Sequence, residues 1–315
     1  MGYIVRTLVD GVEVDSQTVD TYDELQDNSF VTFDLETELD INGGDVFSGG
    51  TDGTVNGEAH QKAREIFESV SFNILAVPSK EKEIQDAYIE YVKRLRDEGQ
   101  KFQIVLPAIN RETKINYEGV IEYANRVTNP IVDAQTDLCY WVAGAEAGCK
   151  VQNSCTAKEY DGQFTISAKV TRAEQRKALQ NGQILFHSVG DTVVILRDIN
   201  TLTKINKGDV QTKHKDFGTN QVVRVLDGIV MESAEVFNSM FLGKRANTLA
   251  ARTELRNQLL KIREHYETIS AIDTYDPTQL VINPGQKPNE VVGRDAIRPL
   301  QAMDTLYLEI TYISE

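Results

Sequence analysis

The sequence predicts an α/β (α+β) protein in which a mixed sheet is flanked by helices and is followed by a second α+β domain. Three observations support this: strand and helix patterns alternate over residues 72–149, a capped helix and hairpin follow at 171–202, and two long amphipathic helices precede a final strand pattern. Strands that alternate with crossover helices are typical of parallel or mixed sheets covered by helices. The 315 residues, of which 41% are hydrophobic, suffice for two domains of ordinary size.

Residues 1–48 are expected to form a β-rich, acidic N-terminal segment. Tyr3–Val19 holds two strand patterns that meet at Asp10-Gly11, a pair typical of hairpin turns. A short strand is expected at Phe30–Leu35. Because the chain begins inside a strand pattern, we expect this segment to be the remainder of a truncated or inserted domain.

A glycine-rich stretch at residues 42–57, NGGDVFSGGTDGTVNG, raises the question of a phosphate-binding loop. A P-loop requires G-x-x-x-x-G-K-[ST], and a dinucleotide fingerprint requires G-x-G-x-x-G between a strand and a helix. The stretch contains neither pattern, so we interpret it as a structural turn. The alternative, a nucleotide-binding α/β enzyme, predicts saturable nucleotide binding that is lost when Gly50 or Gly53 is altered.

The central part of the chain alternates between the two kinds of element. Helices are expected at residues 58–70, 79–98 and 133–149, and strands at 72–77, 101–106 and 117–123. Ser79 is expected to cap the second helix, whose apolar residues recur at helical spacing until Gly99. Three cysteines, Cys139, Cys149 and Cys155, match no zinc or redox spacing, and we interpret them as buried free thiols.

The stretch from Thr171 to Leu202 carries the clearest local signals. Thr171 and Glu174 have the spacing of a capping box, and Gly182 provides a left-handed stop. After an expected strand at residues 164–170 and this helix, a hairpin is expected from strands 183–188 and 192–197. Apolar residues share one face of each hairpin strand, in the pairs Ile184 with Phe186 and Val193 with Ile195.

The last third of the chain predicts two long helices and two strands. Amphipathic helices are expected at about 220–243 and 255–269, and a short strand at 280–282. Asp304–Ile313 alternates in the manner of a strand, with Leu306, Leu308, Ile310 and Tyr312 on one face and Tyr307 on the other. A strand this regular at the end of a chain is expected to pair with its own domain or with an open sheet edge of a neighbour.

Composition and motifs argue against several classes of function. The formal net charge of −15 argues against binding nucleic acid or lying on an anionic membrane, since both use clustered Lys and Arg. The four histidines form no ligand spacing, and the acidic group at Asp34–Asp40 lacks the glycine turn and terminal glutamate of a calcium loop. We therefore predict that the protein is not an enzyme, and we expect no catalytic, cofactor-binding or metal site.

From about Gly49 onward, the order of features resembles the contractile tail sheath proteins of bacteriophages, in particular the prophage type of Gram-positive bacteria. The segments that carry the resemblance are SGGTDG (48–53), YEGVI (117–121), WVAGAEAG (141–148), TRAE with ALQNGQILF (171–186), VVILRDINTLT (193–203), NQVVRVLDGI (220–229) and MDTLYLEI (303–310). The resemblance implies an α/β core sheath domain at residues 49–160 and a C-terminal α+β sheath-assembly domain at 161–315 with a terminal arm strand at 304–313.

The resemblance also implies a function. Subunits of this family stack as hexameric rings in a helical lattice around a tail tube, and contraction drives the tube through the host cell envelope. The implied partners are other sheath subunits, the tail tube protein, the baseplate and the tail terminator; the implied location is the virion tail, after assembly in the bacterial cytoplasm. The sheath of an R-type bacteriocin or of another contractile injection system remains the alternative.

The resemblance assigns roles to the two strand patterns described above. The donated C-terminal strand would carry Leu306, Tyr307, Leu308, Ile310 and Tyr312. The acceptor would be the hairpin at residues 183–197, with Ile184, Phe186, Val193 and Ile195. Because nothing resembling an N-terminal arm precedes Tyr3, this 315-residue form is expected to be largely monomeric.

Overall fold

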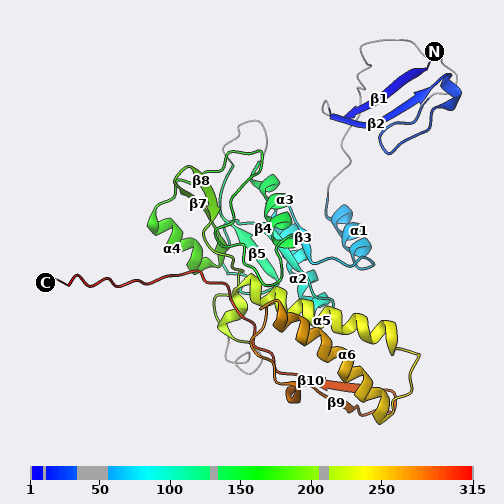
Figure 1. Ribbon diagram of the computed structural model, residues 1–315. Coiled ribbons are helices and arrows are strands. Elements are labelled where there is room, and N and C mark those ends of the chain that lie inside the picture. Colours follow the sequence, from blue (N-terminus) through cyan, green and yellow to red (C-terminus); the bar gives the residue numbers. More distant parts are fainter. Residues whose placement is uncertain (1, 10–11, 34–55, 128–133, 206–212, 314–315) are drawn as a thin grey trace. The chain divides into compact units, whose positions relative to one another are not determined.

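The computed structural model describes residues 2–9, 12–33, 56–127, 134–205 and 213–313 (Figure 1). The chain separates into two compact units, residues 1–55 and 56–315, and each is described by itself. Two predicted features, the glycine-rich stretch up to residue 55 and the acidic group at Asp34–Asp40, lie outside the described residues, as does the Asp10-Gly11 turn.

The first unit contains the predicted hairpin. Strands β1 (Tyr3–Val9) and β2 (Val12–Val19) pair antiparallel, and the short 3-10 helix η1 (Tyr22–Glu24) follows. The expected strand at Phe30–Leu35 is wrong for its described part, since residues 30–33 form no strand. The reason is local: the Asn28 side chain accepts the backbone N–H groups of Phe30 and Val31, and Asp27 accepts that of Phe33, so these donors are not available to a ladder.

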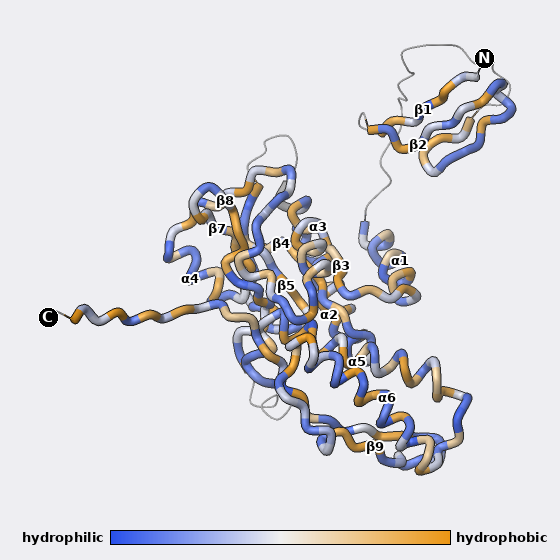
Figure 2. Tube along the Cα trace, in the orientation of Figure 1, coloured by the Kyte–Doolittle hydropathy of each residue, from blue (hydrophilic) through white to orange (hydrophobic). Residues whose placement is uncertain are grey.

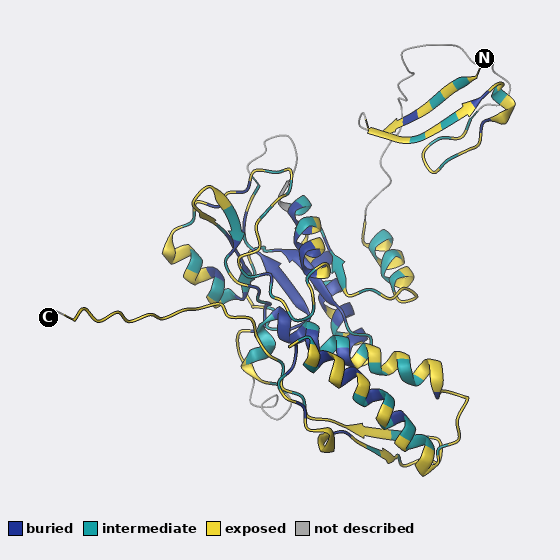
Figure 3. Ribbon diagram, viewed as in Figure 1, coloured by how far each residue is buried: buried dark blue, intermediate teal, exposed yellow. Residues whose placement is uncertain are grey.

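The second unit is built on a parallel sheet in the order β3 (Ile74–Ala76), β4 (Gln103–Pro107), β5 (Val120–Tyr123) and β6 (Gln183–Ile184). The central strands β4 and β5 are buried on both faces, as Figure 3 shows, whereas β3 at the edge of the sheet is partly exposed. Helix α2 (Lys82–Asp97) packs on the face that carries Ile104 and Val120, whereas α3 (Ala134–Ala147) packs on the face that carries Val105 and Ile121. This two-sided cover explains the apolar run at residues 104–106 of β4 and the apolar residues on either side of the buried Glu122 in β5.

Two helices begin differently from the prediction. Helix α1 (Gly57–Phe67) begins one residue earlier than predicted and is capped by Asn56, and its residue Ile66 is exposed. Helix α2 begins after Glu81, so Ser79 is not its cap residue, although the Ser79 hydroxyl accepts the Glu81 N–H at 3.2 Å. Gly99 ends α2 with a positive φ of 106°, as predicted.

The segment before α4 is not the predicted strand. Over residues 164–170 the chain makes a single bridge, between Ile166 and Val127. The Ala168 carbonyl accepts both the Val170 N–H and the Ser188 N–H, so the backbone turns here instead of extending along a neighbouring strand. Sequence alternation alone did not reveal this turn.

Helix α4 (Arg172–Asn181) has the predicted capping box, and Gly182 ends it at a φ of 71°. The predicted strand at 183–188 divides at Leu185 into β6, which pairs with β5, and β7 (Phe186–Val189), which pairs antiparallel with β8 (Thr192–Ile195). The side chains of Ile184 and Phe186 are nonetheless buried in the same core.

The C-terminal part packs two long helices against a hairpin. Helix α5 (Asn220–Met240), preceded by the 3-10 helix η2 (Lys215–Gly218), pairs with α6 (Leu249–Thr268). After η3 (Pro277–Gln279), β9 (Val281–Pro284) and β10 (Val291–Arg294) form an antiparallel hairpin. Ile282 and Val291 pack on the α5–α6 core. Across the described residues, no helix is long and apolar enough to traverse a lipid bilayer.

Candidate assembly site

The C-terminal arm, residues 304–313, is extended and forms no strand with the described part of the chain. The five side chains predicted to lie on the donated strand are between 73% and 92% exposed: Leu306, Tyr307, Leu308, Ile310 and Tyr312. Figure 2 shows hydrophobic and hydrophilic residues alternating along the arm. A segment in which apolar residues alternate with polar ones has the pattern of a β-strand, and exposed apolar side chains on it provide surface for pairing.

The arm is anchored at its root. The Ala302 N–H donates to the Gln221 side-chain oxygen at 2.9 Å, and the Thr219 hydroxyl donates to the Gln301 side chain at 3.4 Å. Asp304 pairs with Arg197, and the hydrogen bond from this guanidinium holds the pKa of Asp304 below its ordinary value. The arm therefore leaves the body of the subunit at Asp304, next to the first turn of α5.

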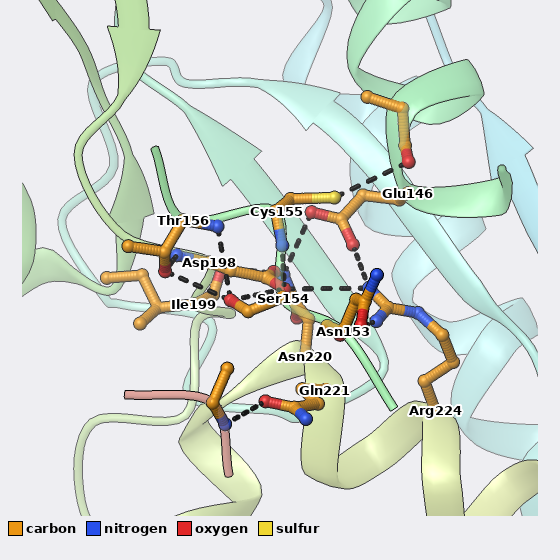
Figure 4. Close-up of polar contacts among 12 residues, drawn as sticks. Glu146, Asn153, Ser154, Cys155, Thr156, Asp198, Ile199, Asn220, Gln221 and Arg224 are labelled. Atoms are coloured by element: carbon orange, nitrogen blue, oxygen red, sulfur yellow. Dashed lines mark hydrogen bonds and ion pairs between the residues drawn. The ribbon is translucent and has the colours of Figure 1, made fainter. Parts of the chain in front are cut away.

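A buried polar network fixes this first turn (Figure 4). The Asn220 side-chain amide donates to Asp198 at 2.7 Å, and the Cys155 N–H donates to the other Asp198 oxygen at 2.9 Å. Arg224 pairs with Glu146 at 2.6 Å. Burial, together with the negative charge of Asp198, raises the pKa of Glu146 well above its ordinary value. One turn of α5 is thus tied to α3 and to the segment after β8.

A second tie lies farther along α5. Arg96 of α2 donates to both carboxylate oxygens of Asp227, at 2.5 and 2.9 Å. Both side chains are largely buried. Buried pairs of this kind hold a geometry strongly, because removing one partner leaves a charge without compensation. Helix α5 is therefore held by α2 as well as α3.

The predicted acceptor hairpin, residues 183–197, has no free edge among the described residues. On β8, the backbone of Ile195 bonds to Ala157 and Lys158, and the Val193 carbonyl accepts the Tyr160 N–H. On β7, the Phe186 backbone bonds to the Asn125 side chain in both directions, at 2.6 and 2.9 Å, and Ser188 bonds to Ala168. The side chains of Ile184, Phe186 and Ile195 lie in the central core, with Val193 packed against it. An incoming strand would have to displace these bonds.

The β9–β10 hairpin offers what β7–β8 does not. Each of its strands has one hydrogen-bonded neighbour, the other, within the described residues. Gly285 donates to Glu290 at 2.8 Å, so the alternation of an antiparallel pair directs the backbone groups of Ile282, Val291 and Gly293 outward. Sequence reasoning missed β10, although the β-branched pair Val291-Val292 after a turn rich in Pro and Gly is a signal for it.

The titratable residues singled out in the sequence are dispersed. His60 contacts Tyr88, and His214 accepts the Asp216 N–H. Cys139 and Cys155 are buried and Cys149 is partly buried, and all three are free thiols. The ligand atoms of Glu146, Cys155 and Asp198 lie within 4.8 Å of one another. Arg224 already supplies positive charge there, at 2.6 Å from Glu146 and 3.5 Å from Asp198, so we assign no metal to this cluster.

An anchored arm with exposed apolar residues and a hairpin with open edges are features of a structural protein that pairs with other chains. Residues 53–201 match the family model described as the phage tail sheath protein central domain, and residues 212–313 match that of the phage tail sheath C-terminal domain. The chain belongs to the phage tail sheath family and is a structural subunit of a contractile tail sheath.

Solved structures and a curated relative agree with this assignment. The sheath tail protein from Desulfitobacterium hafniense is 30% identical with a TM-score of 0.70, over 95% of this chain and 73% of that one. The sheath tail protein Lin1278 from Listeria innocua is 25% identical with a TM-score of 0.69, over 95% of this chain and 70% of that one. The phage-like element PBSX protein XkdK of Bacillus subtilis is 31% identical over 71% of this chain, which spans about half of that protein, 52%.

Proposed function

We propose that this subunit polymerises around a tail tube as stacked hexameric rings, and that contraction of the resulting sheath drives the tube through the host cell envelope. The observation that carries the proposal is the arm: its alternating apolar side chains are exposed, while its root is anchored by Gln221 and Arg197. An anchored root with an unpaired strand beyond it suits a joint between subunits.

We infer that the arm pairs with the β9–β10 hairpin of a neighbouring subunit. Several backbone hydrogen bonds would form, each contributing roughly 0.5–1.5 kcal/mol net. The exposed apolar residues of the arm would be covered on alternate sides. Val281 and Val292, which are exposed on the hairpin, provide apolar surface for such contacts. The edge of β10 is the better acceptor, because Pro284 has no N–H to offer on β9.

Pairing of this kind would link subunits into the helical lattice of a sheath. The arm and the acceptor hairpin are different surfaces, so the contact is heterologous and can propagate without closing on itself. The further partners we propose are the tail tube protein, the baseplate and the tail terminator. Assembly would take place in the bacterial cytoplasm, and the mature location would be the tail of the particle.

Electron microscopy tests the proposal on the protein expressed with any sequence that its gene adds on either side. Deletion of residues 304–315 should abolish sheath-like tubes while leaving the circular dichroism spectrum and the cooperative unfolding transition intact. Glu309→Gln and Thr311→Ser, which keep the strand pattern, serve as matched controls and should leave the tubes unchanged. Regular tubes of normal diameter formed by the deletion variant would refute the role of the arm.

A further inference from the structure

Two cysteines lie together in the loop that follows α3. The Cys149 N–H donates to the Glu146 carbonyl at 3.4 Å, and the Cys155 Sγ lies 3.4 Å from the Ala145 carbonyl. Both cysteines therefore sit against the last turn of the same helix. The two side chains also affect each other's ionisation: the pKa of Cys149 is lowered and that of Cys155 is raised, each mainly through the other thiol. Two thiols held against one helix turn, six residues apart in a short loop, are placed for a disulfide to form between them.

The two thiols differ in access and in acidity. Cys149 is partly exposed and lines a cavity of about 350 Å³ together with Lys101, Arg224 and His265, whereas Cys155 is buried. The hydrogen bond from Cys155 and the charge of Arg224 lower the pKa of Cys149 to about 7, against the opposing effect of burial. A thiol with such a pKa is substantially ionised near neutral pH, and the thiolate is the reactive form.

The third cysteine provides an internal reference. Cys139 is fully buried between α3 and the sheet, and its thiol lies 3.1 Å from the Val105 carbonyl. Burial raises its pKa to about 12. Cys139 is therefore expected to remain reduced under conditions in which Cys149 reacts.

We propose that Cys149 and Cys155 form a reversible disulfide when the subunit meets a peroxide. The Cys149 thiolate attacks hydrogen peroxide, breaks the O–O bond and becomes a sulfenic acid, while the released hydroxide takes up a proton to form water. The Cys155 sulfur then attacks the sulfenic sulfur, the S–O bond breaks, and its oxygen leaves as a second water with the Cys155 proton. Two thiols and one peroxide yield one disulfide and two waters. This chemistry goes beyond the structural role of the sheath.

The disulfide would close the loop that α5 binds. Gln221 donates to the Gln152 carbonyl at 2.8 Å, and Arg224 donates to the Asn153 carbonyl at 2.9 Å. Both acceptors lie between the two cysteines. Closing the loop restricts it in the unfolded chain, so the oxidised subunit should unfold at a higher temperature than the reduced one.

Thiol titration and peptide mapping test the proposal on the full chain. Reduced, desalted protein is treated with a small molar excess of hydrogen peroxide, and free thiols are then titrated after denaturation. Two of the three thiols should be lost, with a mass decrease of two hydrogens, and dithiothreitol should restore them. After tryptic cleavage without reduction, the fragment 127–150 should be linked to the fragment 151–158.

Three variants assign the link. Cys139→Ala should retain the link, because Cys139 takes no part in it. In this variant Cys149 is the single cysteine of the fragment 127–150, so the link can be assigned to Cys149. Cys149→Ser and Cys155→Ser should both lose it. The map of the unaltered protein decides the question even if one variant fails to fold. Retention of all three thiols, a link that involves Cys139, or conversion of Cys149 to a sulfinic acid without any link would overturn the proposal.

Discussion

Arg224 of α5 and Glu146 of α3 form an ion pair with 2.6 Å between nitrogen and oxygen, and the Glu146 side chain is completely buried. Glu146 lies within the region that matches the central-domain family and Arg224 within the region that matches the C-terminal family. Arg224 is also 3.5 Å from Asp198, so one cation serves two buried carboxylates. This arrangement makes the arginine more critical than either acid.

Replacing Arg224 with methionine should therefore be strongly destabilising. The substitution keeps much of the side-chain volume but leaves Glu146 and Asp198 without their cation, and a cost of roughly 3–5 kcal/mol is expected. Urea unfolding measures it. The matched control is Arg245→Met, at an exposed pair with Glu254, which should change stability by less than about 0.5 kcal/mol. Equal effects at the two positions would contradict the assignment.

Glu146 predicts a particular pH dependence. Its pKa is raised in the folded state by burial and by the charge of Asp198, so the folded protein binds the Glu146 proton more tightly than the unfolded chain does. The stability that this proton contributes is complete below the ordinary pKa of 4.5 and is lost as pH rises toward the raised value.

Glu146→Gln isolates this effect, because glutamine cannot ionise. Thermal unfolding of both proteins from pH 4.5 to pH 8 should show the variant gaining stability relative to the unaltered protein as pH increases. The two curves should converge at the acidic end. Parallel curves over the whole range would mean that Glu146 has no raised pKa.

Two glycines with the same backbone conformation should differ in their tolerance of alanine. Gly182 and Gly243 have φ values of 71° and 68°. A Cβ on Gly182 would lie 2.5 Å from the Asn200 carbonyl oxygen, whereas one on Gly243 would meet nothing within 4 Å. Gly243→Ala should cost only the left-handed strain, about 1 kcal/mol, and Gly182→Ala should cost clearly more. Chemical denaturation of the two variants makes the comparison; a smaller effect at Gly182 would count against the observed packing.

The capping box of α4 makes a smaller prediction. The Thr171 hydroxyl accepts the Glu174 N–H, and the Glu174 carboxylate accepts the Thr171 N–H at 2.7 Å. Thr171→Ala should destabilise the protein by about 1 kcal/mol. Thr171→Ser, which keeps the acceptor, is the control and should cost much less. The midpoint of urea unfolding distinguishes the two variants, and equal midpoints would assign no energetic role to the cap.

Local signals in the sequence predicted local structure well. The spacing of Thr171 and Glu174, the glycine at 182 and the amphipathic pattern that predicted a helix at 255–269 each depend on neighbours within one or two turns, and the structure confirms all three. The amphipathic pattern predicted helix α5 but not which polar residues it buries. Asn220 and Gln221 are buried there because their partners, Asp198 and Gln152, are far away in the sequence. Periodicity cannot identify such partners.

Which strand edges are open to pairing was beyond local reasoning for the same kind of reason. The hairpin at 183–197 has a strong strand pattern, but its edges are covered by residues 157–160 and Asn125, which carry no strand signal, and by Ala168, which belongs to the segment predicted as a strand at 164–170. Conversely, β10 is short, and its one local signal, Val291-Val292 after a turn rich in Pro and Gly, was missed. Edge availability depends on which distant backbone groups pair, and a single sequence does not contain that information.

Gln221 has a mechanical consequence. Its amide nitrogen donates to the Gln152 carbonyl and its amide oxygen accepts the Ala302 N–H. The same side chain therefore connects the root of the arm to the loop after α3. Tension applied to the arm would enter the body of the subunit partly through this amide, and would be shared with the Thr219–Gln301 hydrogen bond and the Arg197–Asp304 pair. The force-bearing route through each subunit would thus run along side chains and not through the backbone of the arm alone.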